Sequence, residues 1–293
     1  MAREVDAIVG RIFKDIGQRG HLDLEASEMA IRSSVHRLGG GLLEKLLNAD
    51  GGGYRGRRIA CAQGHMAEFT DYRSKQLLTV LSPVAVERAY YHCATCREGW
   101  APKDIDLDIA GTGLSPGVRW MMGQVGGKEA FGDGRKDLEV LAGVEVTTKA
   151  VERVSEAVGQ QIEEQSRRER EQTLAGKVVP FVGKAEVVKL YVAIDGSGVP
   201  VVARETEGRE GKDETGRAKT REAKLGCVFT QTTVDAKGYP VRDEGSTTYA
   251  GAIEIAEVFG RRIYAEAVRR GLGRANKVIV LGDGAKWIWV RLF

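Results

Sequence analysis

The stretch LYVAIDGSGVPVV, residues 190–202, decides the fold class of this chain. Residues 190–194 form a short apolar run of the kind that occupies a fully buried strand. Asp195 ends the run, and the Gly-Ser-Gly of residues 196–198 predicts a tight turn. Residues 199–204 then predict a second strand, antiparallel to the first.

A similar pattern recurs near the end of the sequence, in KVIVLGDGAKWIW, residues 277–289. Its apolar run predicts another buried strand, and Asp283 follows between two glycines. Between the two patterns, we expect a third strand over residues 224–232 and a helix over residues 249–270. Three strands, a helix and a returning strand predict an α/β domain over residues 188–293. The first elements of an RNase H-like fold follow each other in this order.

Asp195 and Asp283 are expected to be neighbours in such a sheet, each at the end of its strand. Two carboxylates, with a third further along the chain, can hold two Mg²⁺ ions for the in-line displacement of a phosphodiester. One alternative is that each acid is only a turn residue beside glycine. Another is a kinase-like or actin-like site in which the DGSG turn binds phosphate through its backbone. That alternative requires a second phosphate loop and an adenosine pocket, and the sequence contains neither.

Composition indicates an ordinary globular protein. The chain has 293 residues, of which 42% are hydrophobic and 29% charged, which is enough for about two domains. The net charge of +3 does not by itself indicate a nucleic-acid partner. The sequence has no apolar run of membrane-spanning length and no signal-peptide pattern near its start. We therefore expect a cytoplasmic protein without a membrane partner.

Four metal-ligating side chains occur in two closely spaced pairs, joined by a predicted β-hairpin: Cys61 and His65, and Cys93 and Cys96. Zinc binds thiolate and imidazole in a closed tetrahedral site, and a site filled by four protein ligands is structural. The sequence therefore predicts a zinc-ribbon-like domain over residues 59–110. His92 is an alternative ligand, and the contrasting interpretation is that these are ordinary buried cysteines beside a surface histidine.

The remaining N-terminal half is predicted to be helical. Residues 1–58 form an N-terminal helical region, in which Gly39–Gly41 are expected to separate two helices. In residues 111–170, a helix begins after Ser115, and a short helix, a turn at Gly143 and a capped helix follow.

This order of helix, glycine turn and capped helix is typical of a helix-turn-helix. Lys149 and Arg153 then lie at the start of the second helix, where base contacts are made. An αα-hairpin without nucleic acid explains the spacing equally well. Residues 171–187 are predicted to be a linker to the α/β domain.

Several segments together resemble the ISKra-four family of insertion-sequence transposases. They span about residues 60–289 and keep the family's order: CAQGHMAEFTDYRSK, ERAYYHCATC, LSPGVR, LAGVEVTTKAVER, LYVAIDGSGVPV, KLGCVFTQTTVD, STTYAGAIEIAEVFGRRIYAEA and VLGDGAKWIW. The resemblance implies a bacterial DDE-type transposase that binds its element ends and target DNA and performs Mg²⁺-dependent strand transfer. It makes Asp195 and Asp283 the first two catalytic acids, and makes the four Cys and His residues zinc ligands.

The resemblance also implies a departure, because the family's chain continues past GDGAKWIW to its third acid. The expectation is therefore a truncated chain that is inactive or partial as an enzyme. The alternative function is a DNA-binding regulatory fragment without catalysis. Arg217, Lys219 and Arg221 are candidate phosphate contacts, and a homo-oligomer is a possible assembly.

Overall fold

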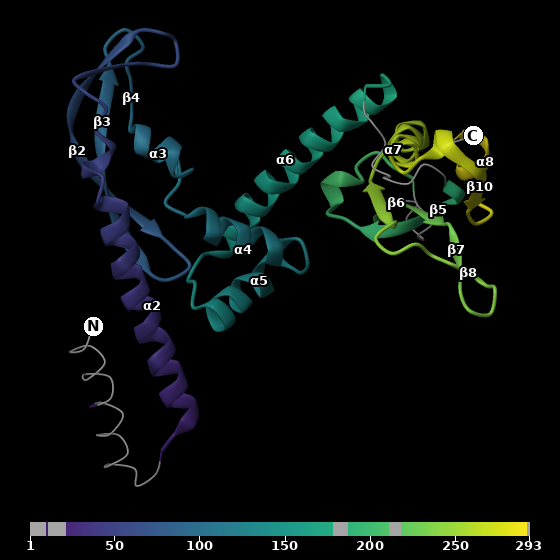
Figure 1. Cartoon of the computed structure of the whole chain (residues 1–293), viewed down its shortest axis with the longest axis horizontal. Helices are drawn as coiled ribbons and strands as arrows, with labels where there is room; N and C mark the ends of the chain where they lie inside the picture. The colour runs from purple at the N-terminus through teal and green to yellow at the C-terminus, as the bar shows by residue number, and fades with distance from the viewer. Residues whose placement is uncertain (1–9, 11–21, 178–186, 211–217, 292–293) are drawn as a thin grey trace. The chain divides into compact units, whose positions relative to one another are not determined.

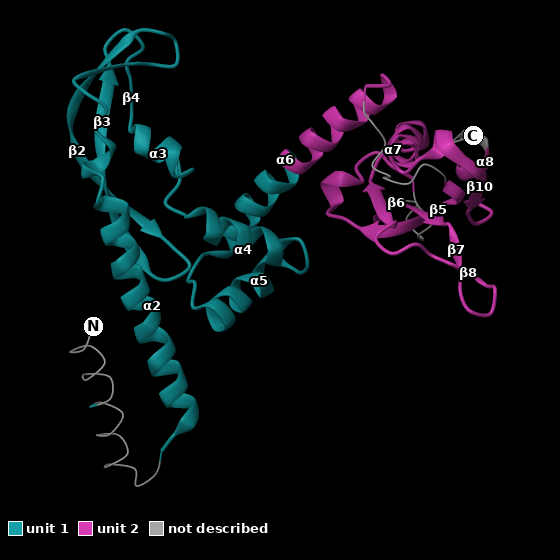
Figure 2. Ribbon diagram, viewed as in Figure 1, with its two compact units in different colours: residues 1–160 teal, residues 161–293 magenta. Residues whose placement is uncertain are grey.

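The computed structural model describes residue 10 and residues 22–177, 187–210 and 218–291 (Figure 1). The chain divides into two compact units, residues 1–160 and 161–293, which are coloured separately in Figure 2. The fold is mixed α/β, with helices and several sheets. Every helix among the described residues is too short or too polar to cross a lipid bilayer.

The first unit begins with one long helix, α2 (Leu24–Asn48), which the Asp23 carboxylate caps by accepting a hydrogen bond from the Ala26 N–H at 3.0 Å. The prediction of two helices separated by glycines was wrong, because α2 continues through Gly39–Gly41. The reason is close packing: a Cβ atom on Gly40 would lie 1.8 Å from Ser82 Oγ. Glycine is therefore needed here for contact, not for a turn.

A four-stranded antiparallel sheet follows α2. Its strands lie in the order β1-β2-β3-β4, with bounds β1 (Arg58–Ala60), β2 (Met66–Leu78), β3 (Pro83–Cys93) and β4 (Glu98–Trp100). The 3₁₀ turn η1 (Gly51–Gly53) precedes the sheet, and α3 (Pro102–Asp106) follows it. The predicted hairpin between the two Cys/His pairs is confirmed as β2 and β3.

Three helical segments complete the first unit and share an apolar core. They are α4 (Pro116–Gly126), α5 (Phe131–Asp137) with its π-helical continuation η2 (Leu138–Ala142), and α6 (Thr148–Leu174), which runs into the second unit. The Ser115 Oγ and Thr147 Oγ1 atoms accept backbone N–H groups at the starts of α4 and α6, where the sequence predicted a helix after Ser115 and a capped helix. Gly143 ends η2 in the left-handed region with φ of 67°, which favours glycine.

The second unit contains a sheet in the order β10-β5-β6-β9. Its strands are β5 (Val187–Pro200), β6 (Thr220–Gln231), β9 (Thr248–Ala252) and β10 (Ala275–Leu281), and only β10 pairs in parallel, with β5. The other elements are short or helical: η3 (Ala203–Glu205), β7 (Thr233–Val234), β8 (Pro240–Val241), α7 (Ala256–Arg269), η4 (Leu272–Arg274) and α8 (Lys286–Arg291).

Two bounds in this unit differ from the sequence prediction. The chain does not turn after Asp195, because residues 196–198 continue β5 and pair with Lys224, Ala223 and Glu222 of β6. The predicted strand over residues 199–204 is therefore the end of β5 followed by η3. The predicted helix over residues 249–270 begins only at Ala256, because the preceding residues form β9. The main sheet has three antiparallel strands before α7, but β9 takes the place of the strand that was predicted over residues 199–204.

One face of this sheet packs against α7 and α8 (Figure 1). Alternate residues of β5, Leu190, Val192 and Ile194, are buried against Phe259 and Ile263 of α7. Strand and helix approach closely, since a Cβ atom on residue 226 of β6 would lie 2.4 Å from Ile263 Cδ1. The largest apolar cluster of the unit therefore lies on this side of the sheet.

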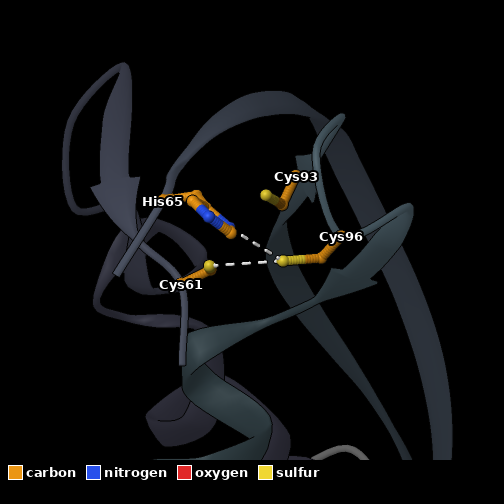
Figure 3. A group of neighbouring side chains, drawn as sticks. All are labelled: Cys61, His65, Cys93 and Cys96. Atoms are coloured by element: carbon orange, nitrogen blue, oxygen red, sulfur yellow. Dashed lines mark hydrogen bonds between the residues drawn. The ribbon is translucent and has the colours of Figure 1, made fainter. Parts of the chain in front are cut away.

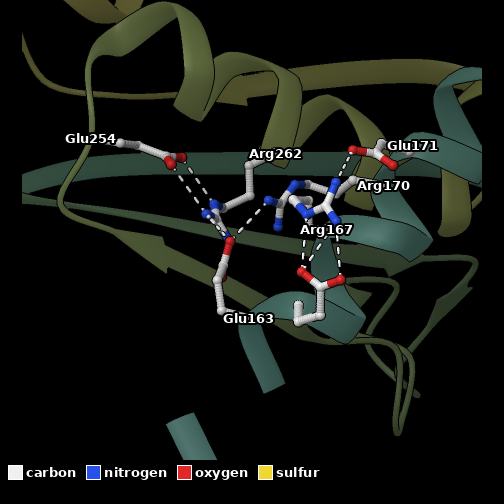
Figure 4. Close-up of polar contacts among 7 residues, drawn as sticks. Glu163, Arg167, Arg170, Glu171, Glu254 and Arg262 are labelled. Carbon is white, nitrogen blue, oxygen red and sulfur yellow. Dashed lines mark hydrogen bonds and ion pairs between the residues drawn. The ribbon is translucent and has the colours of Figure 1, made fainter. Parts of the chain in front are cut away.

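Charged side chains fasten the end of α6 to α7 within the second unit (Figure 4). The Arg262 guanidinium donates to both carboxylate oxygens of Glu163 at 3.0 Å and to Glu254 at 2.9 Å. Hydrogen bonds from Arg262 lower the pKa of Glu163 to about 2. The Arg170 guanidinium lies 3.0 Å from the same carboxylate. This cluster fixes the position of the last turns of α6 on α7.

Candidate functional site

Two tight turns bring the Cys/His pairs together at one end of the first sheet (Figure 3). In the first turn, the Cys61 N–H donates to the His65 carbonyl at 2.7 Å, and Gly64 has a φ of 81°. In the second turn, the Arg97 N–H donates to the Cys93 carbonyl at 2.8 Å, and Arg97 has a φ of 58°. Each turn joins two antiparallel strands, so the side chains of both pairs point into one space.

The ligand atoms of Cys61, His65, Cys93 and Cys96 all lie within 4.8 Å of one another. The Cys61 and Cys96 sulfurs are 3.7 Å apart, and the His65 Nδ1 atom is 3.2 Å from the Cys96 sulfur. Two sulfurs bound tetrahedrally to zinc at about 2.3 Å lie about 3.7 Å from each other. The geometry and the donor set therefore fit a zinc ion, and these four side chains could form a zinc-binding site.

The surroundings of the four ligands distinguish the two cysteines of the second turn. Burial and the neighbouring thiols raise the pKa of Cys96 to about 12, whereas the backbone N–H of Cys96 lowers the pKa of Cys93. Gln63, which the sequence did not single out, places its Oε1 atom 3.4 Å from the Cys96 sulfur. His92, the alternative ligand, is exposed and lies outside the group.

Asp195 and Asp283 lie next to each other in the second unit, as predicted. Strands β5 and β10 pair in parallel up to Ala193 and Leu281, and each acid follows two residues later. Both acids line one open hollow of about 720 Å³. The expected position of Asp195 needs correction, because it lies within β5 and pairs with Leu225, whereas Asp283 lies in the loop after β10.

Both carboxylates are exposed, and each has one oxygen held by a nearby backbone N–H. The Asp195 Oδ1 atom accepts from the Gly196 N–H at 2.7 Å, and the Asp283 Oδ1 atom accepts from the Ala285 N–H at 2.9 Å. Those contacts leave the second oxygen of each group available, and hard oxygen ligands suit Mg²⁺. Among the residues that line the hollow, these two are the only acids.

The hollow lies on the face of the sheet opposite to α7, and its floor is apolar. Leu225 is 53% exposed and Tyr249 is 78% exposed, and both line the hollow beside the acids. The sequence did not indicate these two residues, because Tyr249 lies in the segment predicted as a helix and the predicted strand over residues 224–232 had no face assigned to Leu225. Their alternation with the core residues of β6 and β9 would have been the signal.

The candidate DNA contacts lie in different surroundings. Lys149 is exposed and pairs with Glu152 at 2.7 Å, whereas Arg153 is exposed on the next turn of α6. Arg221 of β6 lies 3.3 Å from the Glu205 carboxylate and shares a face of the β5–β6 pair with Asp195. Lys219 immediately precedes β6, and Arg217 lies outside the described residues.

No protein-family model matches the chain, and none of the curated proteins matches it. The function must therefore be argued from the two sites themselves.

Proposed function

We propose that this chain binds DNA and acts on its phosphodiester bonds at the Asp195–Asp283 pair, as a transposase of the ISKra-four type. The observation that carries the proposal is that two acids far apart in the sequence line one hollow. A pair of exposed carboxylates held by adjacent strands is a suitable seat for divalent cations. The strand order β10-β5-β6-β9, with only β10 parallel, supports an RNase H-like assignment for this unit.

The roles of the residues follow from their positions. The second carboxylate oxygens of Asp195 and Asp283 would hold Mg²⁺, which supplies charge neutralisation at a phosphodiester and lowers the pKa of a bound water. The backbone N–H groups of Gly196 and Ala285 each bind one oxygen of a carboxylate, so the other oxygen would remain for the cation. Arg221, on the same face, would contact a neighbouring phosphate.

The helical region of the first unit would supply DNA affinity. Gly143 and the Thr147 cap set the turn between η2 and α6, and this arrangement leaves Arg153 exposed near the start of α6. A helix that begins in this way after a tight turn suits insertion into a major groove. The zinc-ribbon-like sheet would stabilise the same unit without taking part in the chemistry, because all four positions around the metal are protein ligands.

A DNA-binding regulator without catalysis is the second candidate. The observation that favours it is that two acids, not three, line the hollow. A regulator of this kind would bind element ends and compete with an active enzyme.

The decisive experiment measures nicking of a labelled DNA duplex with Mg²⁺ or Mn²⁺ by the wild-type chain and by Asp195→Asn and Asp283→Asn. The proposal expects cation-dependent nicking that falls by more than about 100-fold in either variant. Glu244→Gln, at an exposed acid outside the hollow, is the matched control. Binding in a gel shift without nicking selects the regulator, and nicking that survives both substitutions contradicts the catalytic assignment.

A further inference from the structure

Helix α2 carries an unusual amount of exposed apolar surface for a helix of a single folded unit. Seven large apolar side chains on or just before it are between 49% and 73% exposed: Leu22, Leu24, Met29, Ile31, Val35, Leu42 and Leu46. Exposed apolar surface that is contiguous marks an interaction site more often than an ordinary surface.

Five of the seven form one narrow stripe. Leu24, Ile31, Val35, Leu42 and Leu46 are separated by seven, four, seven and four residues. At 3.6 residues per turn, these five positions fall within about 60° of arc. In a heptad frame, Leu24 and Ile31 share one seam position and Val35 and Leu42 share the other, whereas Leu46 falls beside the seam.

The stripe lies on the side of α2 that faces away from the sheet. The helix packs on the β2–β3 hairpin through Gly40, which contacts Ser82, and through Glu44 and Asn48, which hydrogen-bond to the backbone of Ala85. On the helical wheel these three residues lie roughly opposite the stripe. The stripe is therefore not used by the fold of the sheet.

Glu28 lies within the stripe and Lys45 lies at its edge, and the signs of these two charges identify the partner. Glu28 lies one turn after Leu24, and Lys45 lies one turn after Leu42, so the acid is near one end and the base near the other. If two copies pair in parallel, Glu28 meets Glu28 and Lys45 meets Lys45. If they pair antiparallel about Val35, each Glu28 lies within about one turn of Lys45 from the other copy.

We propose that the exposed stripe of α2 is a self-association surface, on which a second copy of this chain packs its own α2 antiparallel. The two-fold axis passes near Val35, and Leu24 of one copy lies beside Leu46 of the other. Both contributions are complementary: each copy offers the same apolar stripe, and Glu28 of one copy comes within about one turn of Lys45 of the other. This inference does not depend on the chemistry proposed at Asp195 and Asp283.

The test is the molar mass of the full chain by light scattering during size-exclusion chromatography. The wild-type chain is expected at about twice its 31.9 kDa. Val35→Glu is expected to give the mass of one chain, while Ile162→Glu, at an apolar helix position of similar exposure away from α2, keeps the dimer. A single-chain mass for the wild type at tens of micromolar overturns the proposal.

Charge exchange tests the direction of pairing. Glu28→Lys and Lys45→Glu should each weaken the dimer roughly two- to fivefold, and the double variant should restore it, because the unlike pair is rebuilt in reverse. In a parallel dimer, like charges face each other in the wild type and in the double variant, so the double variant would show no restoration. That result would contradict the antiparallel assignment. Circular dichroism of each variant establishes that α2 remains folded.

Discussion

Glu163 of α6 and Arg262 of α7 face each other as a two-pronged pair, with both N–H···O distances at 3.0 Å. The arginine is the more buried partner, with 12% of its side chain exposed against 53% for the glutamate. The Arg262 guanidinium also donates to Glu254 at 2.9 Å, so one side chain joins α6 to the residues just before α7. The pair therefore links folding of the second unit to pH.

Glu163→Gln should destabilise the second unit at neutral pH and lose its effect in acid. The pKa of Glu163 falls from 4.5 to about 2 on folding, so its carboxylate stabilises the native state above about pH 4.5. That contribution is lost as the pH falls from about 4.5 towards 2. Because the carboxylate is half exposed, we expect less than about 1 kcal/mol at pH 7. Denaturant unfolding of both proteins at pH 7 and pH 2.5 measures the difference, and Glu156→Gln on the exposed side of α6 should show none.

The Cys/His group should contain one zinc ion per chain as purified. Cys96→Ser and His65→Ala should each lose most of the metal and lower the melting temperature, because a four-ligand site stabilises the fold that closes around it. Elemental analysis and thermal unfolding measure both effects. The control is Cys227→Ser, since that thiol belongs to the other unit and should leave zinc content unchanged. Stoichiometric zinc in the Cys96→Ser variant would remove that cysteine from the site.

Two glycines of α5 should respond to alanine in opposite directions. A Cβ atom on Gly134 would lie 2.9 Å from Val125 Cβ of α4, whereas one on Gly132 would meet nothing within 4 Å. Gly134→Ala should therefore cost roughly 1–3 kcal/mol through overpacking. Gly132→Ala should gain up to about 1 kcal/mol from helix propensity. Chemical denaturation of the two variants tests the packing of α4 against α5, and equal shifts would contradict it.

Arg153 should contribute more to DNA affinity than Lys149. Both lie in the first turns of α6, but the Lys149 ammonium is 2.7 Å from Glu152 and is already paired. Arg153→Ala should weaken binding at low salt and reduce the slope of log K against log salt by about one. Lys149→Ala should change both quantities less. Fluorescence anisotropy over a salt series measures them, and the reverse order would move the DNA contact away from the start of α6.

Short-range signals in the sequence predicted the first unit well. The Cys/His pairs, their hairpin, the Ser115 and Thr147 caps and the Gly143 turn all depend on contacts between near neighbours in the sequence. Glycine was the least reliable signal. At residues 39–41 and 196–198 it predicted breaks, but tertiary packing and strand pairing carry the backbone through both segments.

The pairing of β6 with both β5 and β9 was the main feature that the sequence did not indicate. Tyr249 lies near the start of a segment with helical spacing, and only its position opposite Cys227 in the sheet makes it part of a strand. The adjacency of Asp195 and Asp283 was predicted all the same, because it depends on the parallel pairing of β5 with β10 and not on the strand bounds.

The two acids differ in how firmly the fold holds them. Strand β5 pairs with β6 for five residues beyond Asp195, so its backbone cannot shift without breaking the sheet. Asp283 lies in a loop and is held only by local hydrogen bonds. Its carboxylate accepts from the Ala285 N–H at 2.9 Å, and its backbone carbonyl accepts from the Trp289 Nε1–H at 2.6 Å. If a cation binds both carboxylates as proposed, any approach of the two must come from the loop, because β5 is held in the sheet. Asp195 would then provide a fixed ligand, and the loop between β10 and α8 would set the distance between the two carboxylates.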